Sequence, residues 1–258
     1  MAAAFFDLDK TLIEGSSALH FARAAYRNDL ISRRQMARDV WANVRFRLEG
    51  STDESTDVLR ERIAEAIAQR KLDVMRLGHE VLAGVLPAVY PQVLKEAHDH
   101  QDAGRLVYVV TAASHELAET LAHVLLLDGG IGNRSEVCDG VYTGRPEGHF
   151  TYREGKAAAI RDLAESEGID LSSSYAYSDS ESDLPMLRAV GHPVAVNPDR
   201  ELERVAREEG WRIMRFDKLA RRLRLASAAG ALALVGGGGG YLAARLRARR
   251  RLALPHWG

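Results

Sequence analysis

The sequence is poor in cysteine and contains only Cys138. A single cysteine cannot form an internal disulfide, so a fold that needs none, in a reducing compartment, is expected. No pattern that would activate a thiol nucleophile surrounds Cys138, which is interpreted as an inert side chain. The N-terminus, MAAAFFDLDK, also lacks the basic region, long apolar core and cleavage site of a secretory signal. A cytoplasmic protein is therefore predicted.

The chain also lacks an excess of charge of either sign. It has 35 Lys and Arg against 36 Asp and Glu, a formal net charge of -1. This balance gives no bulk electrostatic reason to expect nucleic-acid binding. The histidines, among them His20, His79 and His115, are scattered without the spacing of metal ligands, and no catalytic role is assigned to them.

Short apolar runs alternate with helical patterns along much of the chain. The first run is Ala2 to Leu8, and later ones are RLVYVVTAA, YAYSDS, HPVAVN and WRIMRF. Helical patterns separate them, for example SHELAETLAHVLL and GKAAAIRDLAESEG. The segment SEVCDGVYTGRPEGHFTYREG carries Gly and Pro punctuation typical of a hairpin. Strands that alternate with helices predict an α/β fold with a parallel sheet.

Residues 17–84 interrupt this alternation with helical patterns alone, such as VLRERIAEAIAQRK. We therefore predict a helical insertion directly after the first strand. The predicted organisation is a catalytic core of residues 1–16 and 85–218, a helical cap of residues 17–84 and a basic, apolar C-terminal tail of residues 219–258.

The tail contains an uncharged stretch, residues 225–244, between two arginine clusters. Its length is what a membrane-spanning helix needs, about 20 residues. Five successive glycines, Gly236 to Gly240, weaken a helix by about 1 kcal/mol each in water but are better tolerated in lipid. Two interpretations stay open: attachment to the cytoplasmic face of a membrane through residues 225–244, or helices joined by a flexible linker in solution.

Two pairs of aspartates follow apolar strands. Asp7 and Asp9 come at the end of the first strand, and Asp179 and Asp183 follow the strand in YAYSDSESDLPML. Ligand sites in open α/β sheets lie at the carboxyl ends of strands. A carboxylate can attack phosphorus once a bound cation reduces the repulsion between two anions, and Mg²⁺ takes oxygen ligands of this kind. Each pair alone is more often a capped turn than a site.

Two further polar residues stand at similar places. Thr111 ends the run VVT, where its hydroxyl and the following backbone amides can hold phosphate oxygens. Lys156 lies near a helix start and offers a positive charge to a phosphoryl group and to Asp7. Taken singly, either residue is more simply interpreted as structural or solvated.

The four segments together, Asp-x-Asp-x-Thr at 7–11, Thr111, Lys156 and Asp-xxx-Asp at 179–183, resemble the haloacid dehalogenase-like (HAD) superfamily. The resemblance covers about residues 2–216, and the position of the helical insertion is similar to that of the phosphoserine-phosphatase-like branch, subfamily IB. It implies a Rossmann-like parallel sheet with a helical cap, and a phosphatase that depends on Mg²⁺ and forms an aspartyl phosphate.

The resemblance also implies a role for each matched residue. Asp7 is expected to be the nucleophile, and Asp9 the acid and base that also gives its backbone carbonyl to the metal. Thr111, with the Ala112 amide, is expected to bind phosphate, and Lys156 to neutralise it and hold Asp7. The metal ligands expected in this way are Asp7, Asp9, Asp179 and Asp183, with Thr11 supporting the loop. An aspartate at position 9 favours phosphatase action over dehalogenation, because an alkoxide leaving group needs a proton.

The match departs from the phosphoserine phosphatases at Ser16, where those enzymes carry a glutamate that recognises the substrate's ammonium group, and at Ser182, where they commonly carry asparagine. Arg60 or Arg62 in the insertion could meet a substrate carboxylate, although a solvated helix face is the simpler interpretation. The substrate is thus left among phosphoserine, another small phosphomonoester and a lipid phosphate. A phosphotransferase and a catalytically idle membrane or partner-binding module stay as alternatives, and the oligomeric state is not predicted.

Overall fold

The computed structural model describes residues 1–29, 32 and 76–216. Residues 1–214 form one compact unit, and the second unit, Arg215–Gly258, lies almost wholly outside the described residues. The strands are β1 (Ala3–Asp7), β2 (Leu106–Ser114), β3 (Gly129–Cys138), β4 (Val141–Glu147), β5 (Tyr175–Ser178), β6 (His192–Val196) and β7 (Arg212–Met214). The α-helices are α1 (Ser17–Arg27), α5 (Gly78–Val85), α6 (Pro91–Asp102), α7 (His115–Val124), α8 (Glu154–Glu167), α9 (Leu184–Leu187) and α10 (Arg200–Glu208).

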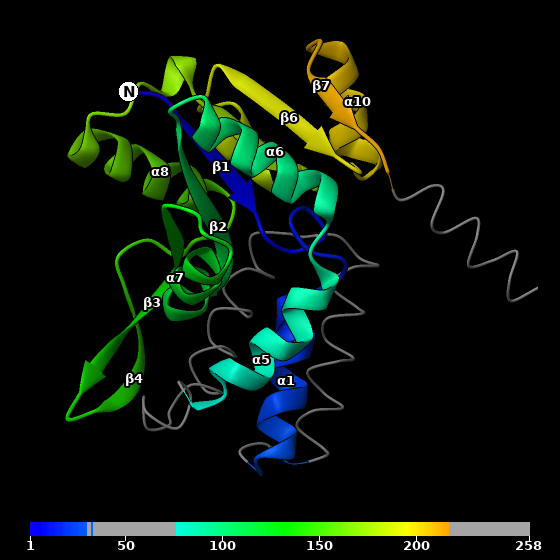
Figure 1. The fold of residues 1–258 in the computed structure, drawn as a ribbon. Helices are drawn as coiled ribbons and strands as arrows, with labels where there is room; N and C mark the ends of the chain where they lie inside the picture. The colour runs from blue at the N-terminus through cyan, green and yellow to red at the C-terminus, as the bar shows by residue number, and fades with distance from the viewer. Residues whose placement is uncertain (30–31, 33–75, 217–258) are drawn as a thin grey trace, which may run out of the picture. The chain divides into compact units, whose positions relative to one another are not determined.

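The described strands form one sheet in the order β4-β3-β2-β1-β5-β6-β7. All neighbours pair in parallel except β3 and β4, which form an antiparallel hairpin (Figure 1). The predicted α/β class with a mostly parallel sheet is confirmed, and five predicted strands correspond to β1, β2, β5, β6 and β7. β1 lies between β2 and β5, so the first strand of the sequence is central in the sheet.

Helices cover both faces of the sheet because successive side chains of a strand point in opposite directions. Phe5 of β1 packs in a core with Ile160 of α8 and Met186 of α9. Phe6, on the other face, packs edge-on against His100 of α6 at 6.1 Å between ring centroids. β1 is therefore buried on both faces, which explains its run of apolar residues.

Strand β3 differs from the sequence prediction, which began the hairpin at Ser135 and assigned no strand to residues 129–134. Close packing requires the glycines of this segment. A Cβ atom at Gly130 would lie 2.2 Å from the Ala118 carbonyl carbon of α7, and one at Gly132 would lie 2.8 Å from the Ala113 carbonyl oxygen. In this strand glycine allows close approach of backbone rather than a turn.

The helical insertion is described only at its two ends, by α1 and α5. These helices lie side by side (Figure 1), and the Asn28 side chain at the end of α1 donates a hydrogen bond to Glu80 of α5 at 2.8 Å. Arg60 and Arg62 lie outside the described residues, and the predicted domain boundaries stay predictions.

Residues 225–244, for which a membrane segment and a linker between helices stay open, also lie outside the described part of the chain. Within residues 1–29, 32 and 76–216, no helix combines the length and the apolar character that crossing a membrane requires.

A buried polar chain lies on the α6 face of the sheet. His100 is 4 % exposed, accepts a hydrogen bond at Nδ1 from Arg105 Nε at 2.6 Å and has Nε2 2.7 Å from the Tyr177 hydroxyl. Because Nδ1 accepts, Nε2 carries the proton and donates to Tyr177, whose hydroxyl in turn donates to Glu96 at 3.1 Å. Burial and the Arg105 guanidinium lower the pKa of His100 to about 4.

The buried His100 in this series of hydrogen bonds makes the free energy of unfolding depend on pH. The folded pKa of His100 lies below the unfolded value of about 6.5, so its stabilisation is complete above pH 6.5 and is lost as the pH falls toward 4. We expect the free energy of unfolding to fall by about 2–3 kcal/mol from this residue alone between pH 7 and 4. Urea titrations at successive pH values should show a flatter slope for His100→Gln than for the native chain. The exposed His123 provides the control, and an equal change of slope in His123→Gln would refute the assignment.

Candidate active site

The site begins at the carboxyl end of the central strand, where Asp7 ends β1 and is 6 % exposed. Lys156, in the first turn of α8, is 3 % exposed. Its Nζ donates hydrogen bonds to Asp7 Oδ1 at 2.5 Å and to Asp183 Oδ2 at 2.8 Å. One buried lysine thus joins carboxylates that lie far apart in the sequence.

Strand β5, next to β1, brings the second acidic pair to the same edge. Asp179 follows the strand directly and is 6 % exposed, and its Oδ2 lies 3.5 Å from Lys10 Nζ. Asp183 is 2 % exposed, and its Oδ2 also accepts a hydrogen bond from Ser178 Oγ at 2.7 Å. Lys10 itself lies in the loop after Asp7 and has a φ of 61°, in the left-handed region.

Three buried carboxylates around one buried ammonium leave excess negative charge. Burial raises the pKa of Asp7, and the carboxylates of Asp183 and Asp179 add to the effect while Lys156 opposes it. Burial also raises the pKa of Asp179. For Lys156, burial acts to lower the pKa, but Asp183 and Asp7 raise it overall, so the ammonium stays charged. Such a site favours an additional cation.

The residues fit a metal that needs few protein ligands. Among the described residues, no group of three or more His, Cys, Asp or Glu side chains is arranged to hold a metal ion. Mg²⁺, however, keeps several waters and commonly takes only one or two protein carboxylates. Asp183 Oδ1 is buried and has no hydrogen-bond partner, which is expected of an oxygen atom that is placed to bind a further ligand or water. The donors are all oxygen atoms, which suits Mg²⁺.

Asp9 turns its side chain toward the start of α1. Its Oδ2 accepts a hydrogen bond from Ser16 Oγ at 3.1 Å, and its Oδ1 accepts one from the Ser17 backbone N–H at 2.8 Å. Both carboxylate oxygens of Asp9 are therefore engaged in hydrogen bonds. Ser16, which replaces the glutamate of phosphoserine phosphatases, holds Asp9 here.

Thr111 lies beside this cluster because Asp7 pairs with Val110, the residue before it. Thr111 is 2 % exposed, and its Oγ1 accepts a hydrogen bond from the Ala113 backbone N–H at 3.1 Å. The Ala112 carbonyl accepts a hydrogen bond from Asn133 Nδ2 at 2.6 Å. The end of β2 at Thr111 therefore lies beside the end of β1 that carries Asp7.

The structure brings Asp7, Lys156 and Asp183 into direct contact, sets Asp179 beside them at the end of β5, and leaves Asp9 linked to α1. Sequence reasoning did not assign Ser178 or Asn133, whose side chains bond to predicted site residues. Ser178 offered a signal, because a hydroxyl directly before a predicted acidic ligand is placed to orient it. Asn133 gave none, because its partners Ala112 and Thr151 lie about 20 residues away and only the fold joins them.

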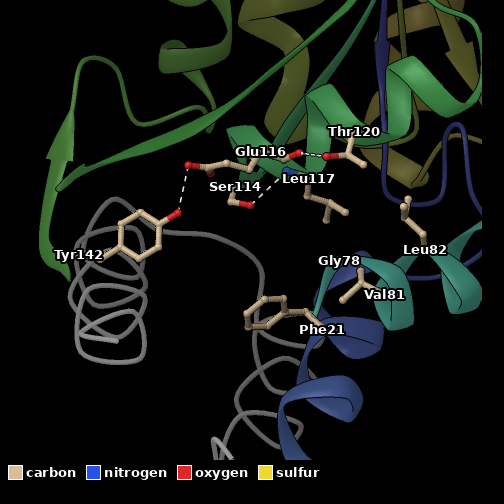
Figure 2. A pocket seen from close by; sticks show the side chains of 9 residues that line it. All are labelled: Phe21, Gly78, Val81, Leu82, Ser114, Glu116, Leu117, Thr120 and Tyr142. Carbon is tan, nitrogen blue, oxygen red and sulfur yellow. Dashed lines mark hydrogen bonds between the residues drawn. The ribbon is translucent and has the colours of Figure 1, made fainter. Parts of the chain in front are cut away.

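A small cavity of about 60 Å³ lies apart from the acidic cluster, between the two described ends of the insertion and α7. Phe21 of α1 and Val81 of α5 face Leu117 of α7 across it (Figure 2). In another part of the cavity wall, the Tyr142 hydroxyl donates a hydrogen bond of 3.0 Å to Glu116 (Figure 2). None of the predicted catalytic or metal-ligating residues lines this cavity.

A family model described as haloacid dehalogenase-like hydrolase matches residues 4–188, which include Asp7, Thr111, Lys156 and Asp183. The chain belongs to this family. The HAD hydrolase is 40 % identical over 254 residues to phosphoserine phosphatase SerB1 of Mycobacterium tuberculosis (strain ATCC 25618 / H37Rv), covering 97 % of this chain and 81 % of the relative. It is 31 % identical over 218 residues to histidinol-phosphatase of Neisseria meningitidis serogroup C (strain 8013), covering 83 % and 98 % of the two chains.

Among solved structures, this HAD hydrolase is similar to a protein of unknown function from Bordetella pertussis Tohama I, with a TM-score of 0.73 and 28 % identity. The match covers 83 % of this chain and 98 % of the other. These similarities confirm a HAD-type phosphatase that is phosphoserine-phosphatase-like.

Proposed function

We propose that this chain hydrolyses a small phosphomonoester with Mg²⁺ through an aspartyl phosphate on Asp7. One observation carries the proposal: Lys156 Nζ bonds to Asp7 Oδ1 and Asp183 Oδ2 at once, at the carboxyl edge of the sheet. A lysine held in this way keeps one oxygen of Asp7 fixed and leaves Oδ2 for attack. Buried clusters of like charge are costly and are typical of functional sites.

In the first step, Asp7 Oδ2 attacks phosphorus while the bond from phosphorus to the leaving oxygen breaks. Asp9 gives a proton to that oxygen, so the leaving group departs as a neutral alcohol. The two hydrogen bonds from Ser16 and Ser17 hold Asp9 in place for this transfer. Since the Ser16 hydroxyl can also accept a hydrogen bond, it can stay bonded to the protonated carboxyl group.

In the second step, Asp9 takes a proton from water, the water oxygen attacks phosphorus, and Asp7 leaves as a carboxylate. Thr111 and the Ala112 amide would hold phosphate oxygens, and Lys156 would balance the charge that develops on them. Phosphatases of this family typically depend on Mg²⁺. When bound, Mg²⁺ would supply positive charge to the phosphoryl group, with Asp7, Asp179 and the Asp9 carbonyl as proposed ligands and Asp183 as a ligand or the orienter of a bound water.

The substrate we propose is a small phosphomonoester. Candidates for its alcohol part include serine and histidinol, which appear in the names of the two relatives. The hydroxyl of Ser16 is used on Asp9, which weakens the case for recognition of phosphoserine at that position. A lipid phosphate is the second hypothesis, because attachment of residues 225–244 to a membrane would place the site at the lipid surface.

The test is phosphate release by the full chain from phosphoserine, histidinol phosphate, glycerol phosphate and lysophosphatidate, with Mg²⁺ or with excess EDTA. We expect release from at least one small ester, restored by Mg²⁺ after chelation. If lysophosphatidate is hydrolysed best, the small-ester proposal is wrong but the mechanism stands. Release that EDTA leaves unchanged would contradict the metal requirement.

A further inference from the structure

Strand β2 carries an irregularity at Thr111, where phosphate is proposed to bind. Val110 pairs with Ile131 and Ser114 pairs with Asn133, with a register shift between them. Residues 111–113 of β2 therefore lie opposite Gly132 alone. Extra residues on one strand bulge outward and lose their regular hydrogen bonds, so something else must fix their backbone.

The Asn133 side chain provides that support on two sides. Its Nδ2 donates to the Ala112 carbonyl at 2.6 Å, and its Oδ1 accepts from the Thr151 backbone N–H at 2.6 Å. The orientation of the amide is unambiguous, because a carbonyl can only accept and a backbone N–H can only donate. Both functions of the amide are used on backbone groups.

The first bond fixes the peptide between Ala112 and Ala113. The carbonyl and the N–H of one planar trans peptide point in opposite directions. With the Ala112 carbonyl held by Asn133, the Ala113 N–H points the other way, where it donates to Thr111 Oγ1 at 3.1 Å. Asn133 thus sets the direction of the backbone donor that holds the Thr111 hydroxyl, without touching the site.

The second bond fixes the turn that leads into the helix of Lys156. Thr151 is 1 % exposed and lies five residues before Lys156. This turn is tight, since a Cβ atom at Gly155 would lie 1.8 Å from the Phe150 carbonyl oxygen. Because this turn has little room to adjust, the position of Thr151 determines the position of the start of α8.

We propose that Asn133 is a positioning residue that ties the irregular end of β2 at Thr111 to the start of α8 at Lys156 and so sets the spacing between the two proposed phosphate-binding groups. The inference rests on the proposed function, because it assumes that phosphate binds between these groups. It assigns no contact between Asn133 and substrate.

The experiment compares Asn133→Asp, Asn133→Ala and the control Asn28→Ala. The aspartate variant keeps the acceptor for Thr151 but faces the Ala112 carbonyl with a second acceptor, whereas the alanine variant loses both bonds without adding charge. Asn28 is a matched control, because its Nδ2 also donates to a backbone carbonyl, that of Ala24, at 2.9 Å at the end of α1. Each protein is assayed for kcat, KM, melting temperature and calorimetric binding of orthovanadate with Mg²⁺.

We expect kcat/KM to fall about 100-fold in Asn133→Asp and at least about 10-fold in Asn133→Ala, since small displacements of positioned groups cost this much. Orthovanadate binding should weaken by at least about 10-fold in both variants and stay within about twofold of the native value in Asn28→Ala.

Native vanadate affinity in both Asn133 variants, or a loss that merely follows the loss of folded protein, would overturn the inference. The proposed function fails separately: a native chain that binds vanadate but hydrolyses no ester would refute the hydrolase, while the Asn133 variants would still decide the inference from binding. If the native chain binds no vanadate, the inference is overturned as well.

Discussion

Asp7→Asn is expected to lower kcat for phosphate release by at least about 10⁴-fold, because an amide cannot form the phosphoryl-enzyme intermediate. The side chain keeps its shape and its oxygen can still accept the hydrogen bond from Lys156. Removing one of three buried carboxylates also relieves repulsion from Asp179 and Asp183. We therefore expect the melting temperature to be unchanged or higher, although activity is lost.

Steady-state phosphate release and a thermal melt on the same preparations check this prediction. Asp139→Asn is the control, since Asp139 is exposed in the β3–β4 turn and has a φ of 50°, which asparagine also tolerates. Its activity should match the native chain. Undiminished release by Asp7→Asn would mean that Asp7 is not the nucleophile. If the native chain released no phosphate from any ester, the result would support the catalytically idle alternative instead.

Lys156→Met is expected to remove activity and to destabilise the protein by about 3–5 kcal/mol. Methionine fills similar space but leaves Asp7 and Asp183 buried without their shared cation. Breaking a buried ion pair from one side is costly, because the remaining charge has lost its partner and cannot reach water. Urea unfolding at neutral pH measures the loss.

A double variant separates charge from packing. Adding Asp7→Asn to Lys156→Met removes one of the unpaired carboxylates, so we expect part of the lost stability to return while activity stays absent. Lys95→Met is the control, because the Lys95 pair with Asp99 is exposed and should leave the unfolding free energy nearly unchanged. A loss in Lys156→Met no greater than in Lys95→Met would show that the buried bridge contributes little.

The central part of the fold could be predicted because local and global signals agree there. The run before Asp7 is apolar at every position, as a strand buried on both faces requires, and the residues that follow are carboxylates at the strand end. β5 likewise leads to an acidic residue, because Asp179 directly follows its mostly buried residues. The parallel sheet then places both ends at one edge, so two separate weak patterns indicate one site.

Other features depend on contacts that no local pattern encodes. Gly130 is required by the backbone of α7, which only the folded structure brings near. Ser16 was predicted as a departure from a substrate-binding position, but its hydrogen bond to Asp9 depends on how the loop returns to α1. Asn133 is similar, because its two partners come from different strands and turns.

The central place of β1 has a consequence for how the chain is made on the ribosome. β1 is the first of the described strands to emerge, yet one of its two neighbours, β5, begins only at Tyr175. Throughout most of translation, the edge of β1 that later pairs with β5 has no partner, and such open apolar edges are prone to pair with other chains. Nascent chains stalled before Tyr175 should therefore engage chaperones more strongly than chains released after Asp183, which also carry every proposed acidic group.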